Sequence, residues 1–405
     1  MEETPFCKYC GSIKTIQIGV WSDGGRKVKS YHCGSCKRRF SISPEERIAA
    51  KQTLGAFVGV QSPPEELLDT LFESKEPSPE RTTFPQDWPA YNAAQTEEKL
   101  LFLEFLEDIT SLVPDKRDCK RGRPSSNLRE MLFACTTKVY ECLSSRRAHS
   151  DLEIARRRGY LSKTPHFNTV LKYFNKPELT PILKALIRIS ALPLAGLEDT
   201  IAIDASGLSS AFYSRWFDYR FNQDRRVKDW IKVHIACGVK TNIVTSINVT
   251  DGTSSDSPEF PHLLQETTEG FRVESVVADK GYSSRKNLQS AWDMGVVPFI
   301  PFKSNSTGKK LSSQAWRKMY HYFRYNNEAF MQAYHCRSNV ESTFSMLKRK
   351  FDNRLFSRNE QAQVNEALAK VLCHNLVVLV HEAKENKIPI DLNDVAHKLP
   401  LLHIK

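Results

Sequence analysis

The order in which strands and helices follow Gly196 restricts the fold of this chain more than any other feature. Runs of β-branched residues bounded by turns predict three consecutive strands, and apolar periodicity then predicts helices that alternate with further strands. The expected elements are strands at Thr200–Asp204, Trp230–Val239 and Asn242–Thr250, helix Ser257–Glu269, strand Val273–Ala278, helix Ser284–Met294, strand Val296–Ile300 and a long helix near Asn327–Lys350. This order predicts an α/β domain in which helices cover both faces of a mixed sheet.

Two aspartates lie where predicted strands end. Asp204 closes an apolar segment and precedes Ala-Ser-Gly, so we expect its side chain where the strand meets a turn. Asp279 follows Val-Val-Ala in the same way, and Gly281 is expected to allow a turn that other residues resist. Such strand ends are the edges at which open α/β sheets form their sites. A single aspartate in this position is nevertheless more often a cap or turn residue.

A third acid lies on the predicted long helix. Offsets of 0, 3, 7 and 14 residues place four side chains along one stripe of a straight helix, at about 100° per residue. These residues are Tyr334, Arg337, Glu341 and Lys348. A neighbouring apolar stripe, expected to pack on the sheet, consists of Val340, Phe344, Leu347 and Phe351. An ordinary ion pair between Glu341 and Arg337, one turn apart, would also explain this acid.

Three carboxylates in this order suit a pair of divalent metal ions. Mg²⁺ and Mn²⁺ are hard cations that take oxygen ligands, and two of them can stabilise the attacking and leaving oxygens of a phosphodiester displacement. Asp204, Asp279 and Glu341 are therefore the predicted catalytic residues and ligands of Mg²⁺ or Mn²⁺. Arg337 and Lys348 are suited to the phosphate oxygens of a bound strand.

The pattern of Tyr334, Arg337, Glu341 and Lys348 resembles the Tyr-Arg-Glu-Lys signature of bacterial and archaeal cut-and-paste insertion-sequence transposases. Asp204, and the segment Asp-Lys-Gly-Tyr that begins at residue 279, resemble the other two acidic motifs of that family. The resemblance covers about residues 161–351. It implies a DDE-type endonuclease with an RNase H-like catalytic domain, which also matches the element order.

The resemblance further implies roles for the side chains of the signature and for DNA. The three acids would form the catalytic triad, and Tyr334, Arg337 and Lys348 would contact the transposon end near the cleaved phosphate. The partner would be double-stranded DNA, as terminal inverted repeats and as target, and two ends would be brought together by a homodimer. Hydrolysis of one strand would free a 3′-OH that then attacks the target DNA.

Four cysteines near the N-terminus have the spacing of a zinc site. Cys7 and Cys10 form one Cys-x-x-Cys pair, and Cys33 and Cys36 form a second, with 22 residues between the pairs. This spacing predicts a Zn²⁺-binding zinc ribbon, whose hairpin would pair residues 15–21 with 28–32. A redox pair, or four unrelated buried thiols, is the alternative. Ribbons precede the catalytic domain in some other insertion-sequence transposases, whereas the Tyr-Arg-Glu-Lys group does not generally carry one.

Two basic regions precede the catalytic domain. Arg121 and Arg123 lie in Lys-Arg-Gly-Arg-Pro, which resembles an AT-hook core for the minor groove of A·T-rich DNA, although a solvated charged loop explains the segment equally well. Arg146–Arg158 and the segment from His166 to Phe174 fall within a region of predicted helices. The helices expected there begin at Thr96 and continue at Asn127–Leu143, Ser150–Arg158 and Pro177–Ser190.

Charge and composition agree with a DNA-binding protein. The chain of 405 residues has a formal charge of +11 and a pI near 9.1, and residues 61–115 hold thirteen acidic but only three basic residues. The basic charge is thus concentrated outside that acidic segment, as expected when the rest of the chain meets a polyanion. No apolar run is long enough for a membrane span, and the N-terminus lacks the features of a secretory signal. We expect a cytoplasmic, nucleoid-associated prokaryotic protein with reduced thiols.

The length and the changes in composition predict a multidomain chain. Its expected parts are a zinc ribbon at 1–43, a short helix with an acidic Pro-rich linker at 44–95, an all-helical DNA-binding domain at 96–195, the RNase H-like catalytic domain at 196–380 and a C-terminal tail at 381–405. Two other functions remain open. One is a catalytically silent, transposase-derived DNA-binding regulator, and the other is a different RNase H-like nuclease, which predicts no Tyr-Arg-Glu-Lys helix.

Overall fold

The computed structural model describes residues 15–23, 26–35, 37, 39–42, 86–114, 126–210, 230–308 and 313–396. The chain forms two compact units. The smaller unit comprises Met1–Ser78 and Glu274–Arg337, and the larger unit comprises Pro79–Val273 and Ser338–Lys405. No helix in the described ranges is both long and apolar enough to cross a membrane.

An antiparallel sheet of β4 (Thr200–Ser209), β5 (Trp230–Gly238) and β6 (Val244–Asp251) forms the core of the larger unit. The apolar side chains that the sequence predicted for these strands are buried, as Ile203 and Ile235 show with 0% exposure. Asp204 pairs with Ile235, and the pairing with β5 continues to Ser209. The prediction that Asp204 ends its strand is therefore wrong, because ladder pairing with β5 outweighs the turn tendency of Ala-Ser-Gly.

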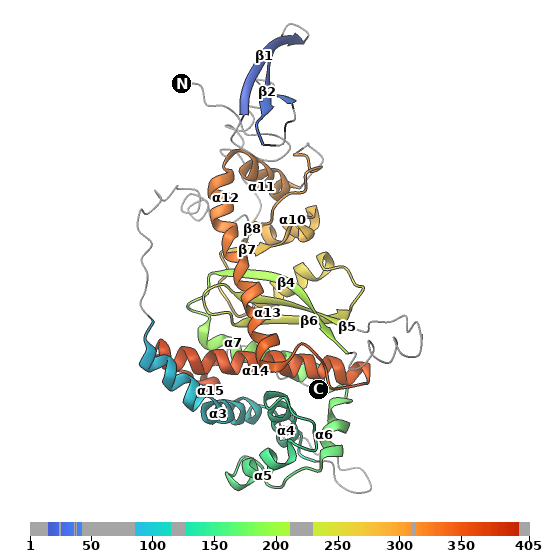
Figure 1. Ribbon diagram of the computed structural model, residues 1–405, viewed down its shortest axis with the longest axis vertical. Helices are drawn as coiled ribbons and strands as arrows, with labels where there is room; N and C mark the ends of the chain where they lie inside the picture. The colour runs from blue at the N-terminus through green and yellow to red at the C-terminus, as the bar shows by residue number, and fades with distance from the viewer. Residues whose placement is uncertain are drawn as a thin grey trace. The chain divides into compact units, whose positions relative to one another are not determined.

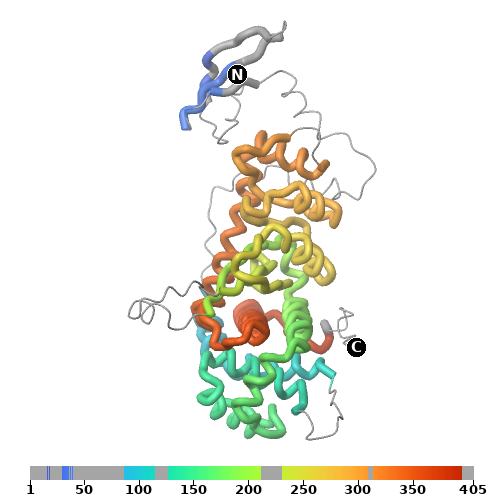
Figure 2. Tube along the Cα trace, turned by 90° about the vertical axis from the view of Figure 1, so that its right-hand side faces the viewer, coloured from blue at the N-terminus to red at the C-terminus, as the bar shows by residue number. Residues whose placement is uncertain are grey.

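The described part of the larger unit also contains helices. They are α3 (Trp88–Ser111), α4 (Leu128–Tyr140), α5 (His149–Arg157), α6 (Phe167–Phe174), α7 (Leu179–Ala191), the 3₁₀ turns η1 (Leu192–Leu194) and η2 (Ser257–Glu259), α9 (Phe260–Thr268), α13 (Ser338–Phe351), α14 (Glu360–Glu385) and α15 (Leu392–Ala396). The long helix α14 packs against α3, α4, α6 and α7, and also against β5 and β6. Within this unit it lies between the sheet and helices α4–α6 (Figures 1 and 2).

The smaller unit contains two sets of strands. Its N-terminal strands β1 (Thr15–Asp23), β2 (Arg26–Cys33) and β3 (Arg39–Ile42) are antiparallel, which agrees with the predicted hairpin and adds a third strand. Its later strands β7 (Ser275–Ala278) and β8 (Val297–Phe299) are parallel. The helical elements are η3 (Lys280–Tyr282), α10 (Arg285–Asp293), α11 (Gln314–Tyr325), α12 (Asn327–Tyr334) and η4 (His335–Arg337).

Strands of both directions with helices packed around them agree with the predicted mixed α/β architecture. One predicted element is broken: the long helix near Asn327–Lys350 is α12, a 3₁₀ turn and α13. Helix α3 begins at Trp88, before residue 95 where the linker was expected to end, because Asp87 caps the helix and Pro89 is accepted in its first turn. The predicted domain boundaries remain predictions.

Candidate active site

Asp204 lies in the middle of β4, on a strand whose preceding residues form the core. Its Oδ1 accepts the N–H of Ala205 at 2.9 Å, and the side chain is half-buried. Ile201 and Ile203 before it have 0% exposure. A carboxylate on a strand that pairs with β5 along its length has a fixed backbone position, which a metal ligand requires.

Glu341 lies in the first turn of α13, and its side chain is exposed. The predicted apolar stripe is confirmed, since the helix buries Val340, Phe344, Leu347 and Phe351. Helix α13 packs against β4, the strand of Asp204. Lys348, two turns after Glu341, is half-buried and donates from Nζ to Ser206 Oγ at 2.6 Å. Burial lowers the pKa of this lysine.

The start of α13 is fixed by polar contacts that the sequence did not reveal. Asn339 Nδ2 donates to the carbonyl of Val239, at the β5–β6 turn. Thr343 Oγ1 donates to Asn242 Oδ1 at 3.1 Å, and Asn242 has φ 63°, a left-handed conformation that asparagine tolerates. The asparagine in that turn was the available sequence signal, but nothing in the sequence linked it to a helix about 100 residues later. These contacts hold the helix of Glu341 on the sheet.

The segment after α13 is also tied to β4. The N–H of Ser209 donates to the carbonyl of Asn353 at 2.9 Å, and the N–H of Leu355 donates to the carbonyl of Ser209 at 2.8 Å. Together with the bond between Lys348 and Ser206, these contacts fix the C-terminal end of α13 to β4, while its start is held at the β5–β6 turn. The larger unit therefore brings together the two elements that carry Asp204 and Glu341.

Asp279 belongs to the smaller unit, where it follows β7, so the predicted position at a strand end is confirmed. Its Oδ1 accepts the N–H of Lys280 at 2.5 Å and caps η3. Tyr282 is buried, whereas Gly281 is exposed and has no left-handed φ. The expected role of Gly281 in allowing an unusual turn is therefore wrong, because the chain passes through η3 with conformations open to other residues.

Tyr334 ends α12, and Arg337 ends the 3₁₀ turn η4 that follows it. A 3₁₀ turn has about 3.0 residues per turn, so the 100° phase of a straight α-helix does not carry across it. The prediction of one continuous stripe from Tyr334 to Lys348 is wrong for that reason. A 3₁₀ stretch inside a helical run often marks a functional hinge.

Two further polar residues of the larger unit, Asp256 and His234, have defined contacts. Asp256 precedes η2 without making a helix-capping bond, and it pairs with Lys232 at 2.9 Å. His234 is fully buried on β5, and its Nε2 lies 2.8 Å from Thr250 Oγ1, so it is a histidine of the core. Within either unit, the described residues include no group of three or more His, Cys, Asp or Glu side chains that could hold a metal ion. The predicted set of three carboxylates draws on both units.

Most of the predicted accessory sites lie outside the described residues. These are Cys7, Cys10, Cys36, Arg121 and Arg123. Cys33 is described: it ends β2, is fully buried, and its Sγ accepts the N–H of Ser35 at 3.4 Å.

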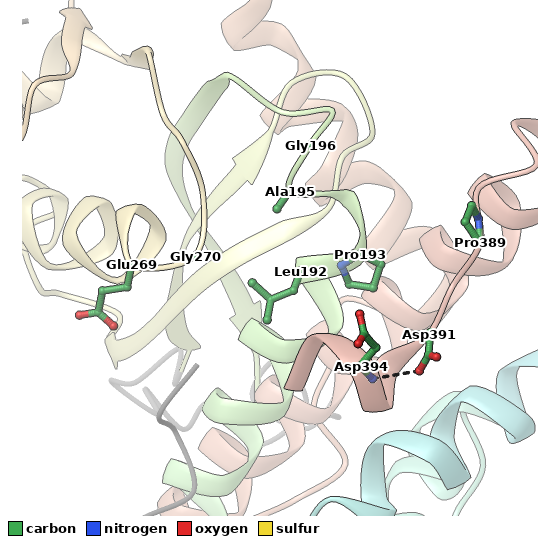
Figure 3. Close-up of a pocket in the computed structure, with 9 residues that line it drawn as sticks. All are labelled: Leu192, Pro193, Ala195, Gly196, Glu269, Gly270, Pro389, Asp391 and Asp394. Carbon is green, nitrogen blue, oxygen red and sulfur yellow. Dashed lines mark hydrogen bonds between the residues drawn. The ribbon is translucent and has the colours of Figure 1, made fainter. Parts of the chain in front are cut away.

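A pocket in the larger unit is separate from all of these residues (Figure 3). It is lined by η1, the loop after α9 and the start of α15. Two of the carboxylates that line it have structural partners: Glu269 pairs with Arg188 at 2.5 Å, and Asp391 Oδ1 accepts the N–H of Asp394 at 3.0 Å.

Carboxylates presented by strands and a helix of an α/β framework are typical of enzymes that cleave phosphodiester bonds with divalent metal ions. Residues 195–376 match the family model of the transposase DDE domain, and this range contains Asp204, Asp279 and Glu341. No solved structure matches the chain. The match supports a DDE transposase, a type of enzyme whose substrate is DNA.

Proposed function

We propose that this protein is a DNA transposase that cleaves one strand at each transposon end and joins the freed 3′-OH to target DNA. The observation that carries the proposal is the match of residues 195–376 to the transposase DDE domain, because the match spans all three predicted catalytic acids. The packing of α13 on β4 supports it, since these elements carry Glu341 and Asp204. The four-residue signature narrows the proposal to the cut-and-paste type.

In the proposed mechanism, Asp204, Asp279 and Glu341 hold two Mg²⁺ or Mn²⁺ ions. Their donor set fits these metals, because all the ligand atoms are carboxylate oxygens and two of the three acids follow or lie within buried strands. When bound, the ions supply charge stabilisation for the attacking and leaving oxygens. Lys348 and Arg337 bind phosphate oxygens of the same strand, and Tyr334 helps to position the transposon end.

The lowered pKa of Lys348 has a consequence for this mechanism. Burial disfavours the charged form of its ammonium group, and its described hydrogen bond is to a neutral hydroxyl, that of Ser206. A phosphate oxygen brought next to this ammonium would favour the charged form and form a strong, charge-assisted hydrogen bond. Lys348 is therefore suited to bind DNA phosphate at β4.

The activity is tested with the full chain, Mn²⁺ or Mg²⁺ and a plasmid that carries the DNA flanking its coding region. We expect nicks at the outer ends of terminal inverted repeats, with a 3′-OH on the transposon side. Intact plasmid, under conditions in which the protein binds the same ends, would favour the silent regulator. Cleavage at four-way junctions in preference to these ends would favour a different RNase H-like nuclease.

We also propose that Cys7, Cys10, Cys33 and Cys36 bind one structural Zn²⁺. The described part of this module fits a metal-bound thiolate, because Cys33 is buried and its Sγ accepts a backbone N–H. Lys37 follows with φ 58°, and its N–H donates to the carbonyl of Cys33 at 3.0 Å, so the chain turns tightly around this cysteine. Four thiolates at this spacing favour tetrahedral zinc.

Metal analysis tests the zinc proposal. We expect one zinc per wild-type chain and a substoichiometric amount in Cys33→Ser, because loss of one thiolate leaves a tetrahedral site incomplete. Cys237→Ser is the matched control, since this buried thiol lies in β5 outside the ribbon. Wild-type protein without zinc, after purification without chelators, would contradict the proposal.

Dimerisation at the synapsis of two ends is part of the proposed function. It predicts that cleavage of one end depends on a second end in the same reaction.

A further inference from the structure

Helices α5 and α6 and their connecting loop carry a concentration of positive charge. Residues 143–176 contain eight Lys or Arg side chains and only two acids, Asp151 and Glu153. Both acids are paired: Asp151 with Lys99 at 3.2 Å, and Glu153 with Arg156 at 2.6 Å. The positive charge of this surface is therefore not neutralised by its own carboxylates.

Glu153 organises the arginines of α5. Its carboxylate accepts two hydrogen bonds from Arg156, at 3.0 and 2.6 Å, and one from Arg157 at 3.2 Å. It also accepts the hydroxyl of Thr164 at 2.5 Å, which ties the loop between the two helices to α5. These bonds lower the pKa of Glu153, the bond from Arg156 most of all. The loop is also held to α4, where Glu130 accepts the N–H of Ser162 at 3.1 Å.

Other basic side chains around this scaffold are exposed. Within the part of the chain that the structure describes, no ion pair involves them. They are Arg146, Arg147, Arg158, Lys163 and Lys172. Arg146 lies near the start of α6, because its guanidinium is 5.3 Å from the ring of Phe167. Basic side chains thus occur on α6 itself and near its first turn.

Helix α6 has one face fixed in the core. It buries Val170, Tyr173 and Phe174, and the hydroxyl of Tyr173 donates to the carbonyl of Ser126 at 2.7 Å. The buried Asn365 of α14 donates to the carbonyl of Phe174 at 2.8 Å and so fixes the C-terminal end of the helix. The body of α6 is therefore rigid.

The opposite face of α6 is open. It presents Asn168, Leu171 and Lys172, of which Leu171 is 43% exposed. An amide, an ammonium and an apolar group on a single helical face can donate to, accept from and pack against the edges of bases. His166 Nδ1 caps the helix by accepting the N–H of Asn168 at 3.2 Å, so the first turn is well ordered.

We propose that α6 enters the major groove of double-stranded DNA, with Asn168 and Lys172 reading base edges while Arg146, Arg147 and Arg158 bind phosphates. The positive charge of this surface favours a polyanionic binding partner. A B-form major groove is about 12 Å wide and admits an α-helix, whereas the deep, narrow groove of A-form RNA does not. The large exposed apolar side chains here, Ile154 and Leu171, are aliphatic, so stacking of single-stranded bases is not favoured.

This inference rests on the proposed function in that the DNA read by α6 would be the transposon end. It assigns sequence reading to one helix of the larger unit and phosphate contacts to α5 and the residues around it. The role of Glu153 follows from this assignment, because its bonds orient Arg156 and Arg157 on α5 and tie them, through Thr164, to the loop that leads to α6.

The test uses the full chain and a fluorescein-labelled pool of 30-base-pair duplexes with a randomised centre, without added divalent metal. Arg146→Ala/Arg147→Ala should weaken binding to all sequences alike and reduce the slope of log K against log salt by roughly one per residue. Asn168→Ala/Lys172→Ala should abolish enrichment of a preferred sequence from the pool while most of the non-specific affinity remains. Arg272→Ala/Lys384→Ala, which removes two charges elsewhere on the larger unit, is the matched control and should change neither property.

Each outcome decides for or against the surface. Equal binding, slope and enrichment in both α5–α6 variants and the control would overturn the inference, as would preferential binding of single-stranded DNA or RNA of the same length. Urea midpoints within experimental error of wild type establish that these exposed substitutions leave the fold intact. Normal end cleavage by both variants would overturn this surface while the transposase function stands. Sequence-specific binding through α6 without end cleavage by the wild-type chain would contradict the function and leave the surface in place.

Discussion

Glu341→Gln should abolish metal-dependent cleavage at transposon ends while leaving DNA binding close to that of wild type. The amide has nearly the same size and hydrogen-bonding reach as the carboxylate, but it carries no charge and is a poor ligand for Mg²⁺. The side chain is exposed in the first turn of α13, so the substitution removes little packing. We expect the cleavage rate to fall by at least about 10²-fold, the effect of losing one group that stabilises charge in the transition state.

The measurement is single-turnover cleavage of an end-labelled duplex in Mn²⁺, with binding measured separately by gel shift. Glu360→Gln is the matched control, because Glu360 is also an exposed acid in the first turn of a helix. It should cleave at the wild-type rate. Cleavage by Glu341→Gln at the rate of this control would remove Glu341 from the proposed site. Loss of binding along with cleavage would show that the substitution acts on DNA docking and not on the chemical step.

Local patterns predicted the strands and the position of Asp279, whereas pairing between distant segments decided the position of Asp204. Asp279 follows a short buried strand and caps the next turn, an arrangement that depends on a few adjacent residues. Asp204 precedes three residues that favour turns, yet β4 continues through them because β5 pairs with each one. A ladder with a strand about 30 residues away is not visible in the local sequence.

The helix of Glu341 was also predicted only in part from the local sequence. Periodicity correctly predicted the buried stripe that includes Phe344 and Leu347, because one face of α13 packs on β4. It missed the 3₁₀ turn at His335–Arg337, since nothing in the spacing of apolar residues distinguishes 3.0 from 3.6 residues per turn over so few positions. Contacts such as those of Asn339 and Thr343 with the β5–β6 turn are likewise tertiary.

Helix α14 was not predicted because it is buried on nearly all sides. A helix that packs against several neighbours loses the single apolar face on which periodicity depends. Its buried positions also include polar residues, among them Glu366, Lys370 and Asn375. Asn375 bonds to both the N–H and the carbonyl of Val244 and to the carbonyl of Ile187, so its amide joins α14 to β6 and α7. The burial of these polar groups is explained by partners that lie far away in the sequence.

Among these buried polar residues, Glu366 is an acid that contacts polar groups of several neighbours. It is 1% exposed, and its two carboxylate oxygens accept the N–H groups of Phe356 and Ser357 at 2.9 and 2.8 Å. Lys138 of α4 lies 3.8 Å from the same carboxylate. Lys370, one turn further along α14, donates to the carbonyl of Arg354 at 2.6 Å, and burial lowers its pKa while the nearby Glu366 opposes that shift. One carboxylate thus compensates two buried ammonium groups.

Glu366→Ala should therefore lower the free energy of unfolding by about 3–5 kcal/mol, the cost of removing one partner from a buried ion pair. Both lysines would remain buried without their carboxylate, and two backbone N–H groups would lose their acceptor. Urea unfolding followed by far-UV circular dichroism measures the change. Glu360→Ala on the exposed first turn of the same helix should cost less than about 1 kcal/mol, mainly through the helix dipole. Equal urea midpoints for the two variants would show that Glu366 does not compensate Lys138 and Lys370. A large difference would show that the buried carboxylate of Glu366, which binds the loop after α13, stabilises the larger unit.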